Sequence, residues 1–189
     1  KVALIGHSIG TITSICTLGR HGPLVDELVA TGWAHVPRVI PVDPSAFEQP
    51  LQRASVVFPA DFRTRLFYHL PTTDPAIIQY DNDHLANGLP RALMLDVVGL
   101  MTALGIGDPA QIKATSLVDR VAVPVLVQLG QYDLIAPSSL AAQEGSFFGA
   151  SPGVTVQTLA DIGHDFNLHL NHLSSWHKID AWLAATRGG

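Results

Sequence analysis

Three short segments, far apart in the chain, carry a hydroxyl, a carboxylate and an imidazole. Ser8 lies in the segment GHSIG, Asp133 in GQYDLIAP and His164 in DIGHD. A serine hydroxyl becomes a strong nucleophile when an imidazole accepts its proton, and a carboxylate can hold that imidazole in the required tautomer. We therefore predict that the three side chains act together, with Ser8 as nucleophile, His164 as general base and Asp133 as the orienting acid.

The segment GHSIG has the G-x-S-x-G pattern of a strained turn between a strand and a helix. The apolar run Val2–Ile5 precedes it, and a helical pattern, Ile9–Leu18, follows it. In such a turn the serine hydroxyl is exposed, the two glycines leave room for close packing of strand and helix, and the N–H of Ile9 faces a developing oxyanion. Five-residue matches also occur by chance, so an ordinary glycine-rich turn is the alternative at this point.

Each of the two other residues follows an apolar run. Asp133 comes after Val123–Leu129 and His164 after Val154–Leu159, and both runs are typical of buried parallel strands. Taken alone, Asp133 is read as a turn or capping residue and His164 as a surface residue. Because the carboxyl ends of parallel strands meet at one edge of a sheet, their joint occurrence with Ser8 favours a shared site.

Other ionisable residues near these motifs offer alternatives. Asp43 follows the run VIPV and is an alternative acid. Asp161 and Asp165 flank the histidine, and we expect them to shape its loop. His7 precedes the serine, and we expect its side chain to point away and to pack or form a hydrogen bond. Its position also makes it a candidate contact for an oxyanion or substrate.

Closely spaced histidines could also bind a metal ion. His164, His169 and His172 suggest such a site, but no cysteine or suitably spaced carboxylate completes the ligand set. Serine hydrolysis needs no metal, so we predict neither a metal nor a cofactor. Cys16 is the only cysteine, so no disulfide can form within the chain, and we expect it in the core.

Alternating strands and helices must bring the three motifs together. The patterns predict strands at Val2–Ile5, Val39–Val42, Val123–Leu129 and Val154–Leu159, and helices at Ile9–Leu18, Leu24–Ala30, Arg91–Leu104, Ser138–Glu144 and Leu173–Ala185. Residues 44–120 are rich in proline, aspartate and short helical patterns, and we interpret them as an inserted helical cap. Residues 1–43 and 121–189 then form the α/β core.

Composition excludes several other classes of protein. The chain has 189 residues, of which 47% are hydrophobic and 14% charged, and its net charge is −5, so it is globular and has no basic footprint for nucleic acid. It contains no run of 18 apolar residues, so no membrane span is expected. Both a cytoplasmic and a secreted location are compatible with the sequence.

Taken together, these motifs resemble the α/β-hydrolase superfamily, whose triad residues occur in the order serine, acid, histidine. The segments Leu66–Asp83 and Gly163–His169 resemble hydrolases of the esterase and lipase kind. The resemblance implies cleavage of carboxylic esters of a small or medium apolar substrate through an acyl-enzyme. Hydrolysis of lactones, thioesters or C–C bonds, acyl transfer, and simple ligand binding on the same scaffold are the alternatives.

In this interpretation, the cap supplies the walls of an apolar pocket. The candidate residues are Phe58, Phe62, Phe67, Tyr68, Leu93, Met94, Val97 and Met101. The alternative for most of them is that they pack the cap onto the sheet.

The chain departs from the superfamily pattern at its beginning. In that superfamily the serine turn follows the fifth strand of an eight-stranded sheet, so the resemblance implies that 1–189 is the C-terminal part of the fold. The first four strands, and the segment that supplies a second oxyanion donor, have no counterpart. We therefore predict that the chain works with a complementary N-terminal polypeptide that carries those strands.

Overall fold

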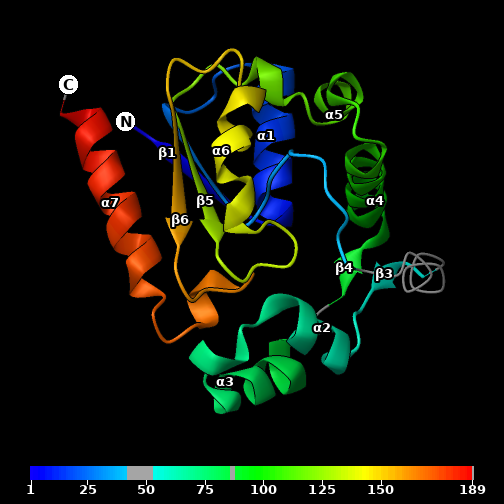
Figure 1. Cartoon of the computed structure of the whole chain (residues 1–189). Helices are drawn as coiled ribbons and strands as arrows, with labels where there is room; N and C mark the ends of the chain where they lie inside the picture. The colour runs from blue at the N-terminus through cyan, green and yellow to red at the C-terminus, as the bar shows by residue number, and fades with distance from the viewer. Residues whose placement is uncertain (42–52, 86–87, 189) are drawn as a thin grey trace.

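A four-stranded parallel sheet forms the centre of the computed structural model, which describes residues 1–41, 53–85 and 88–188 (Figure 1). Its strands, in spatial order, are β1 (Ala3–His7), β2 (Glu27–Thr31), β5 (Val125–Gly130) and β6 (Val154–Leu159). All three neighbouring pairs are parallel. The loops after the four strands therefore meet at one edge of the sheet.

Helices cover both faces of this sheet (Figure 1). One face carries α1 (Ile9–His21) and α6 (Ala141–Glu144), and the other carries α7 (Leu173–Arg187). Because side chains alternate along a strand, neighbouring residues of β2 serve different faces. Leu28 packs in the core with α1, whereas Val29 packs with Ile179 and Trp182 of α7.

Most predicted elements are found with small shifts in their ends. The strands β1, β5 and β6 and the helices α1, α4 (Arg91–Ile106) and α7 confirm the corresponding predictions. The predicted helix Ser138–Glu144 is divided between a 3-10 turn and α6. The 3-10 helices of the described chain are Leu70–Thr72, Val118–Arg120, Ser138–Leu140, Gly145–Phe147 and Phe166–Leu168.

The predicted helix Leu24–Ala30 is wrong, because the segment forms strand β2. Its leucines and acidic residues favour a helix by propensity, but every residue of β2 is buried between two strands. Glu27 is only 1% exposed, and Arg187 and Thr186 at the end of α7 bind its carboxylate. A partner distant in sequence thus allows a charged residue to lie in an interior strand.

The predicted strand Val39–Val42 is also not found in the part that can be described. Residues 39–41 have no strand structure, and Val39 is 93% exposed. Pro41 lacks the N–H that a central strand needs, which gives the physical reason. Val42 lies outside the described residues.

Two groups of elements lie between β2 and β5. The helices α2 (Ala60–Phe67) and α3 (Pro75–Tyr80), with a π-helical turn at Asp81–Leu85, lie beyond the carboxyl ends of the strands (Figure 1). The helices α4 and α5 (Pro109–Ser116) stand beside α1 and share its apolar core. A short two-stranded antiparallel ribbon, β3 (Ser55–Val56) with β4 (Leu89–Pro90), joins the groups.

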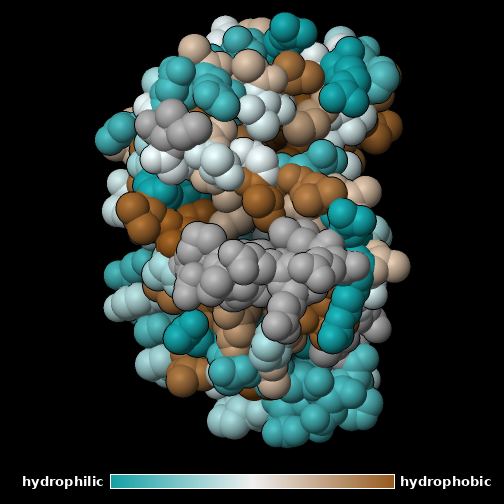
Figure 2. All heavy atoms as spheres, turned by 90° about the vertical axis from the view of Figure 1, so that its right-hand side faces the viewer, coloured by the Kyte–Doolittle hydropathy of each residue, from teal (hydrophilic) through white to brown (hydrophobic). Residues whose placement is uncertain are grey.

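The predicted cap, 44–120, therefore contains one group at the sheet edge and one packed along the core. Figure 2, which faces the side of α4 and α5, shows hydrophobic residues gathered across the middle of this side and hydrophilic residues towards its ends. The division of the chain at residues 43 and 44 lies outside the described residues and stays a prediction. No helix in the described ranges is long and apolar enough to cross a membrane.

Candidate active site

Ser8 occupies a strained position between β1 and α1. Its φ and ψ angles are 52° and −117°, and its backbone N–H donates to the carbonyl of Thr31 on β2, at 2.9 Å. A Cβ atom at Gly6 would lie 2.7 Å from the carbonyl oxygen of Gly10, so strand and helix approach each other too closely for any other residue. At Gly10 a Cβ atom would meet no described atom within 4 Å, so the prediction that both glycines are needed for close packing is wrong for Gly10.

The three predicted side chains meet at the carboxyl edge of the sheet. The Ser8 hydroxyl donates to Nε2 of His164 at 2.8 Å, and Nδ1–H of His164 donates to Oδ2 of Asp133 at 3.0 Å. The two contacts are compatible with one tautomer, in which Nδ1 carries the proton and Nε2 accepts from the serine. This is the arrangement that removal of the serine proton requires.

The environment of Asp133 keeps it ionised. Its second oxygen, Oδ1, accepts the backbone N–H groups of Ile135 at 2.7 Å and Ala136 at 2.9 Å. Burial alone would raise the pKa of Asp133, but the charge of His164 and these hydrogen bonds outweigh burial and lower it. Burial alone would lower the pKa of His164, and the neighbouring Asp133 carboxylate raises it instead.

The loop that carries His164 is joined to the cap by both flanking acidic residues. Asp161 has a left-handed backbone, with φ of 55°, and its carbonyl accepts the Thr72 hydroxyl at 2.7 Å. The N–H of Asp165 donates to the carbonyl of Phe67 at 3.0 Å. These contacts agree with the expectation that Asp161 and Asp165 shape the loop. Burial raises the pKa of Asp165 to about 6.

A small apolar cavity of about 70 Å³ opens beside Ser8. Of the predicted contacts, Ile9, Phe67 and Met94 line it. Tyr68 does not, because its hydroxyl donates to the carboxylate of Asp81 at 2.6 Å, in a buried cluster with Arg63. The other described residues around the cavity are Trp33, Ile40, Phe58, Phe62, Leu66, Val97, Met101 and Ile135.

Sequence reasoning missed four of these wall residues: Trp33, Ile40, Leu66 and Ile135. Trp33 and Ile40 follow β2, so a strand prediction there would have placed their loop at the site edge. Ile135 is two residues after Asp133 and could have been included from its position alone. Leu93 was predicted to line the pocket, but it borders a separate hollow between α1 and α4, together with Cys16.

The side chain of His7 lies on the side of His164 that faces away from the cavity beside Ser8. The Thr31 hydroxyl donates to the carbonyl of Gly6, so Nδ1–H of His7 donates to that hydroxyl, at 2.8 Å. Its ring packs 5.1 Å from the rings of both His164 and Phe166. His7 does not line the cavity beside Ser8, and it borders a different hollow with Asp165.

The geometry bears on the alternative metal ligands among the histidines and on the alternative acid, Asp43. His7, His164 and Asp165 bring ligand atoms within 4.8 Å of one another, but Nε2 of His164 is already bonded to Ser8. Both nitrogens of His169 are bonded to backbone groups, which removes it from the proposed histidine set. Asp43, the alternative acid, lies outside the described residues.

Comparison with known proteins shows similarity in structure. No family model and no curated protein sequence matches the chain. Among solved structures, a thermophilic esterase from Thermogutta terrifontis is 20% identical, with a TM-score of 0.65 over 98% of this chain and 65% of that chain. A monoacylglycerol lipase from Paleococcus ferrophilus is 17% identical, with a TM-score of 0.63 over 98% of this chain and 68% of that one.

A third similar structure, an enol-lactonase from Burkholderia xenovorans, is 18% identical, with a TM-score of 0.60 over 94% of this chain and 63% of that one. All three similarities extend over nearly the whole of this chain but over only 63–68% of the other proteins. The parallel sheet, the helices on both of its faces and these similarities agree. The chain therefore has the α/β-hydrolase fold.

Proposed function

We propose that the protein is a serine hydrolase that cleaves carboxylic esters. The observation that carries this proposal is the series of hydrogen bonds from Ser8 through His164 to Asp133, at the carboxyl edge of a parallel sheet. The strained backbone of Ser8 is typical of a nucleophile held out of its strand. The esterase and lipase structures that share the fold support the same reaction class.

The geometry supports a two-step mechanism. Oγ of Ser8 attacks the ester carbonyl carbon while Nε2 of His164 takes the hydroxyl proton. The tetrahedral intermediate expels the alcohol, which receives that proton and leaves an acyl group on Ser8. His164 then takes a proton from water, the hydroxide attacks the acyl carbon, and the carboxylic acid departs as Ser8 regains its proton. Asp133 stabilises the imidazolium in both steps.

The oxyanion of each intermediate needs hydrogen-bond donors. Ile9 is the first residue of α1, and the first N–H groups of a helix have no acceptor within that helix. We therefore propose the N–H of Ile9 as the first hydrogen-bond donor to the oxyanion. Loss of one such donor costs about 2.7–4 kcal/mol of transition-state stabilisation in other hydrolases. We propose that a complementary polypeptide supplies the second donor.

The proposed complementary polypeptide addresses this second donor. In the described sheet, β1 pairs with β2 along one edge, and no described strand pairs with its other edge. An open strand edge is a template for further pairing. We propose that a parallel strand covers it, from a polypeptide that also carries the second donor. Mass analysis of the purified particle tests this: a second polypeptide bound to this chain supports the proposal, and a fully active monomer of 1–189 contradicts it.

The cavity beside Ser8 supports an apolar acyl group. Apart from Ser8, its described lining residues are hydrophobic. Its volume of about 70 Å³ is small beside the roughly 300–1,000 Å³ of pockets that enclose drug-sized ligands. We therefore propose a short acyl chain as the preferred substrate group.

Replacement of the nucleophile tests the mechanism. Ser8→Ala should lower kcat for short p-nitrophenyl esters by roughly 10⁴-fold or more, because no other group can form the acyl-enzyme. A fluorophosphonate probe should label Ser8 in the unaltered protein and not in the variant. Ser146→Ala, at an exposed serine after α6, is the matched control and should retain both ester turnover and labelling by the probe. Unchanged turnover in Ser8→Ala would remove Ser8 from the mechanism, and a ligand-binding protein should react slowly or not at all with the probe.

Enlargement of the cavity tests the proposed substrate. Met94 is 2% exposed and lines the cavity from α4. Met94→Ala should shift the preferred p-nitrophenyl ester to an acyl chain longer by several carbons and destabilise the protein by about 2–5 kcal/mol. Leu95→Ala, at an exposed neighbour on the same helix, is the control. An unchanged chain-length preference would place the acyl group elsewhere.

Lactone hydrolysis is the second candidate, because the enol-lactonase shares the fold and a lactone is an internal ester. The same three residues would perform it. A panel of linear esters, lactones and thioesters, measured by kcat/KM, separates these substrates.

A further inference from the structure

His169 lies five residues beyond His164 and has a partner for each ring nitrogen. Its Nδ1 is 2.9 Å from the carbonyl oxygen of Asp165, and its Nε2 is 3.1 Å from the backbone N of His69 and 3.0 Å from that of Gly163. A carbonyl can only accept, so Nδ1 must carry a proton. Two N–H groups can only donate, so Nε2 must be unprotonated. The partners therefore require one neutral tautomer.

The three partners of this ring surround His164. Gly163 and Asp165 are the residues on either side of His164, so one imidazole holds both sides of the loop. The third partner, His69, belongs to the cap segment Phe67–His69. This segment forms a second link to the loop, because the N–H of Asp165 donates to the carbonyl of Phe67.

The same cap segment packs on His164 itself and on Tyr132, the residue before Asp133. The ring of Phe67 lies 5.4 Å from that of His164. The ring of His69 stacks on Tyr132, the neighbour of Asp133, with centroids 3.8 Å apart and planes within 5°. A displacement of the segment would therefore move the surroundings of both the base and the acid.

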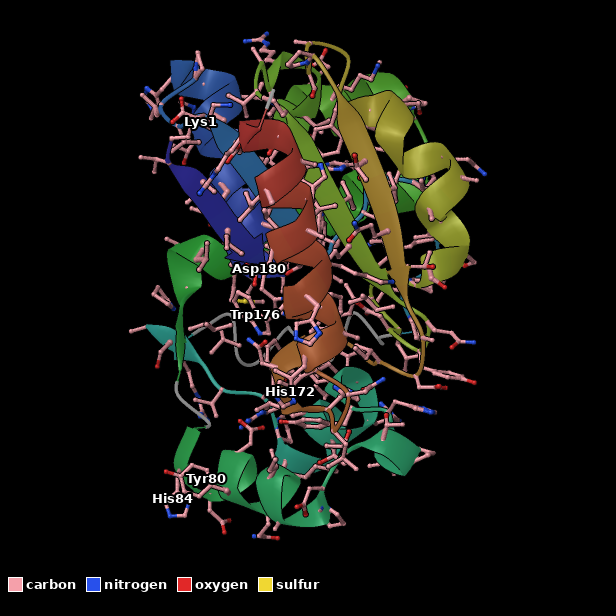
Figure 3. All side chains as sticks on the ribbon, turned by 90° about the vertical axis from the view of Figure 1, so that its left-hand side faces the viewer. Lys1, Tyr80, His84, His172, Trp176 and Asp180 are labelled. Atoms are coloured by element: carbon pink, nitrogen blue, oxygen red, sulfur yellow. The ribbon has the colours of Figure 1, made fainter. Side chains whose placement is uncertain are left out.

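Little free space surrounds this junction. A Cβ atom at Gly163 would lie 2.7 Å from the backbone N of His69 and 3.0 Å from Nε2 of His169. His169 itself is 1% exposed and does not line the cavity beside Ser8. Figure 3 marks the adjoining residue His172 where the chain enters α7 above the cap helices. The buried ring can therefore contact the loop but not a substrate.

We propose that His169 is a positioning residue, which holds the His164 loop and the cap segment Phe67–His69 in the one arrangement that aligns His164 with Ser8. This proposal rests on the proposed hydrolase function for its effect on catalysis, but its hydrogen-bond pattern can be tested separately. Its effect passes through His164, because the ring touches no reacting atom.

The arrangement should also depend on pH. The ionisable or charged groups around the ring are Asp165, His69, Asp133 and the hydroxyl of Tyr68. Burial, with the neighbouring His69, lowers the pKa of His169, so the neutral form persists below the usual histidine range. Protonation at lower pH would direct a third N–H towards the two N–H groups already there and break the links to His69 and Gly163.

Three substitutions separate the two halves of this link. The amide oxygen of His169→Gln can reach the place of Nε2 and accept the two N–H groups. The shorter His169→Asn can replace only Nδ1, and His169→Ala replaces neither. We expect kcat to fall by roughly 10²-fold in the Asn and Ala variants, the scale of a displacement near 1 Å, with a smaller change in KM. His169→Gln should recover most of kcat. His177→Gln, on the exposed side of α7, is the control.

The pH profile distinguishes positioning from a general loss of stability. The unaltered protein should lose activity in two proton steps on acidification, the first from His164 and the second, at lower pH, from His169. The Gln variant should retain the first step and lose the second. Should His169→Ala fail to fold, the comparison of the Gln and Asn variants decides, and equal kcat in the two would overturn the proposal. Unaltered kcat and pH profile in a folded Ala variant would do the same.

Nitrogen-15 NMR of the ring tests the link without any substrate. We expect His169 as the neutral Nδ1–H tautomer at a pH below the usual histidine pKa, and slow hydrogen exchange at the backbone N–H of His69 and Gly163. The Nε2–H tautomer would overturn the inference even if the protein hydrolyses esters. The expected tautomer with no ester turnover would instead contradict the proposed function and leave the link intact.

Discussion

The proposed nucleophile, Ser8, and the proposed base, His164, are held in place by different means. Ser8 depends on its immediate neighbours: the turn between β1 and α1, the close approach at Gly6 and the first residues of the helix. His164 depends on partners about 100 positions earlier in the chain, in the segment Phe67–His69, and on His169 behind its loop. One part of the site is therefore encoded locally, and the other forms only when the cap segment reaches the sheet edge.

This difference indicates which part of the site would respond to a movement of the cap segment. Strain in the turn fixes the position of Ser8 as soon as strand and helix pack together. By contrast, the proposed link makes the position of His164 depend on the cap segment, which also forms a wall of the cavity through Phe67. If the proposed function holds, movement of the cap segment would alter substrate binding and the alignment of the proposed base together.

The largest effect is expected at the proposed acid, Asp133, which binds His164. Asp133→Asn should lower kcat by about 10⁴-fold, as the corresponding change does in serine proteases, because the amide no longer selects the required tautomer. Asp133 raises the pKa of His164, so activity should rise with pH through a value above the usual 6.5. Removal of the carboxylate charge should move this acid limb to lower pH. An unmoved limb in the pH profile of kcat/KM would show that Asp133 does not act on His164.

A substitution in the turn tests whether the nucleophile is positioned locally. Gly6→Ala would place a Cβ atom 2.7 Å from the backbone of Gly10, so strand and helix must separate. We expect a loss of about 1–3 kcal/mol in the free energy of unfolding, with a loss of kcat. Gly10→Ala is the matched control in the same turn, with open space at its Cβ, and should be neutral or stabilising by up to about 1 kcal/mol. Denaturant unfolding of both variants measures the contrast, and equal stabilities would refute it.

A smaller effect is expected at the remote part of the site. Gly163→Ala should push the cap segment from the loop, because its Cβ atom would lie 2.7 Å from the backbone of His69. KM and kcat should both change, by roughly tenfold, while Ser8 stays accessible to a fluorophosphonate. Gly153→Ala, at a glycine whose Cβ atom would meet no described atom within 4 Å, should leave all three unchanged. A Gly163 variant that alters stability but neither kinetic constant would contradict the comparison.

The locally encoded features were the ones that the sequence could predict. The turn around Ser8, the strand before Asp133 and the order of the three residues depend on short patterns, and the three side chains meet as expected. The catalytic roles of these residues stay predictions. Strand β2 was missed because its residues favour a helix by propensity, and only burial between two strands overrides that preference.

The contacts of the cap could not be predicted in the same way. Nothing in the residue types of Phe67–His69 indicates that their backbone groups bind the loop of His164. The histidine cluster suggested metal ligands, whereas both nitrogens of His169 bind backbone groups. Such hydrogen bonds depend on spatial proximity, which spacing along the chain does not reveal.

The buried Glu27 in β2 has a consequence for how the sequence can vary. Its carboxylate is bound by Arg187, which lies 160 residues away at the end of α7. Loss of Arg187 alone would leave the buried Glu27 carboxylate with only the Thr186 hydroxyl among its side-chain partners described above, whereas replacement of both Glu27 and Arg187 by apolar residues can be nearly neutral. In related chains, positions 27 and 187 should therefore change together, so that an apolar residue in the strand accompanies the absence of a cation at the end of the helix.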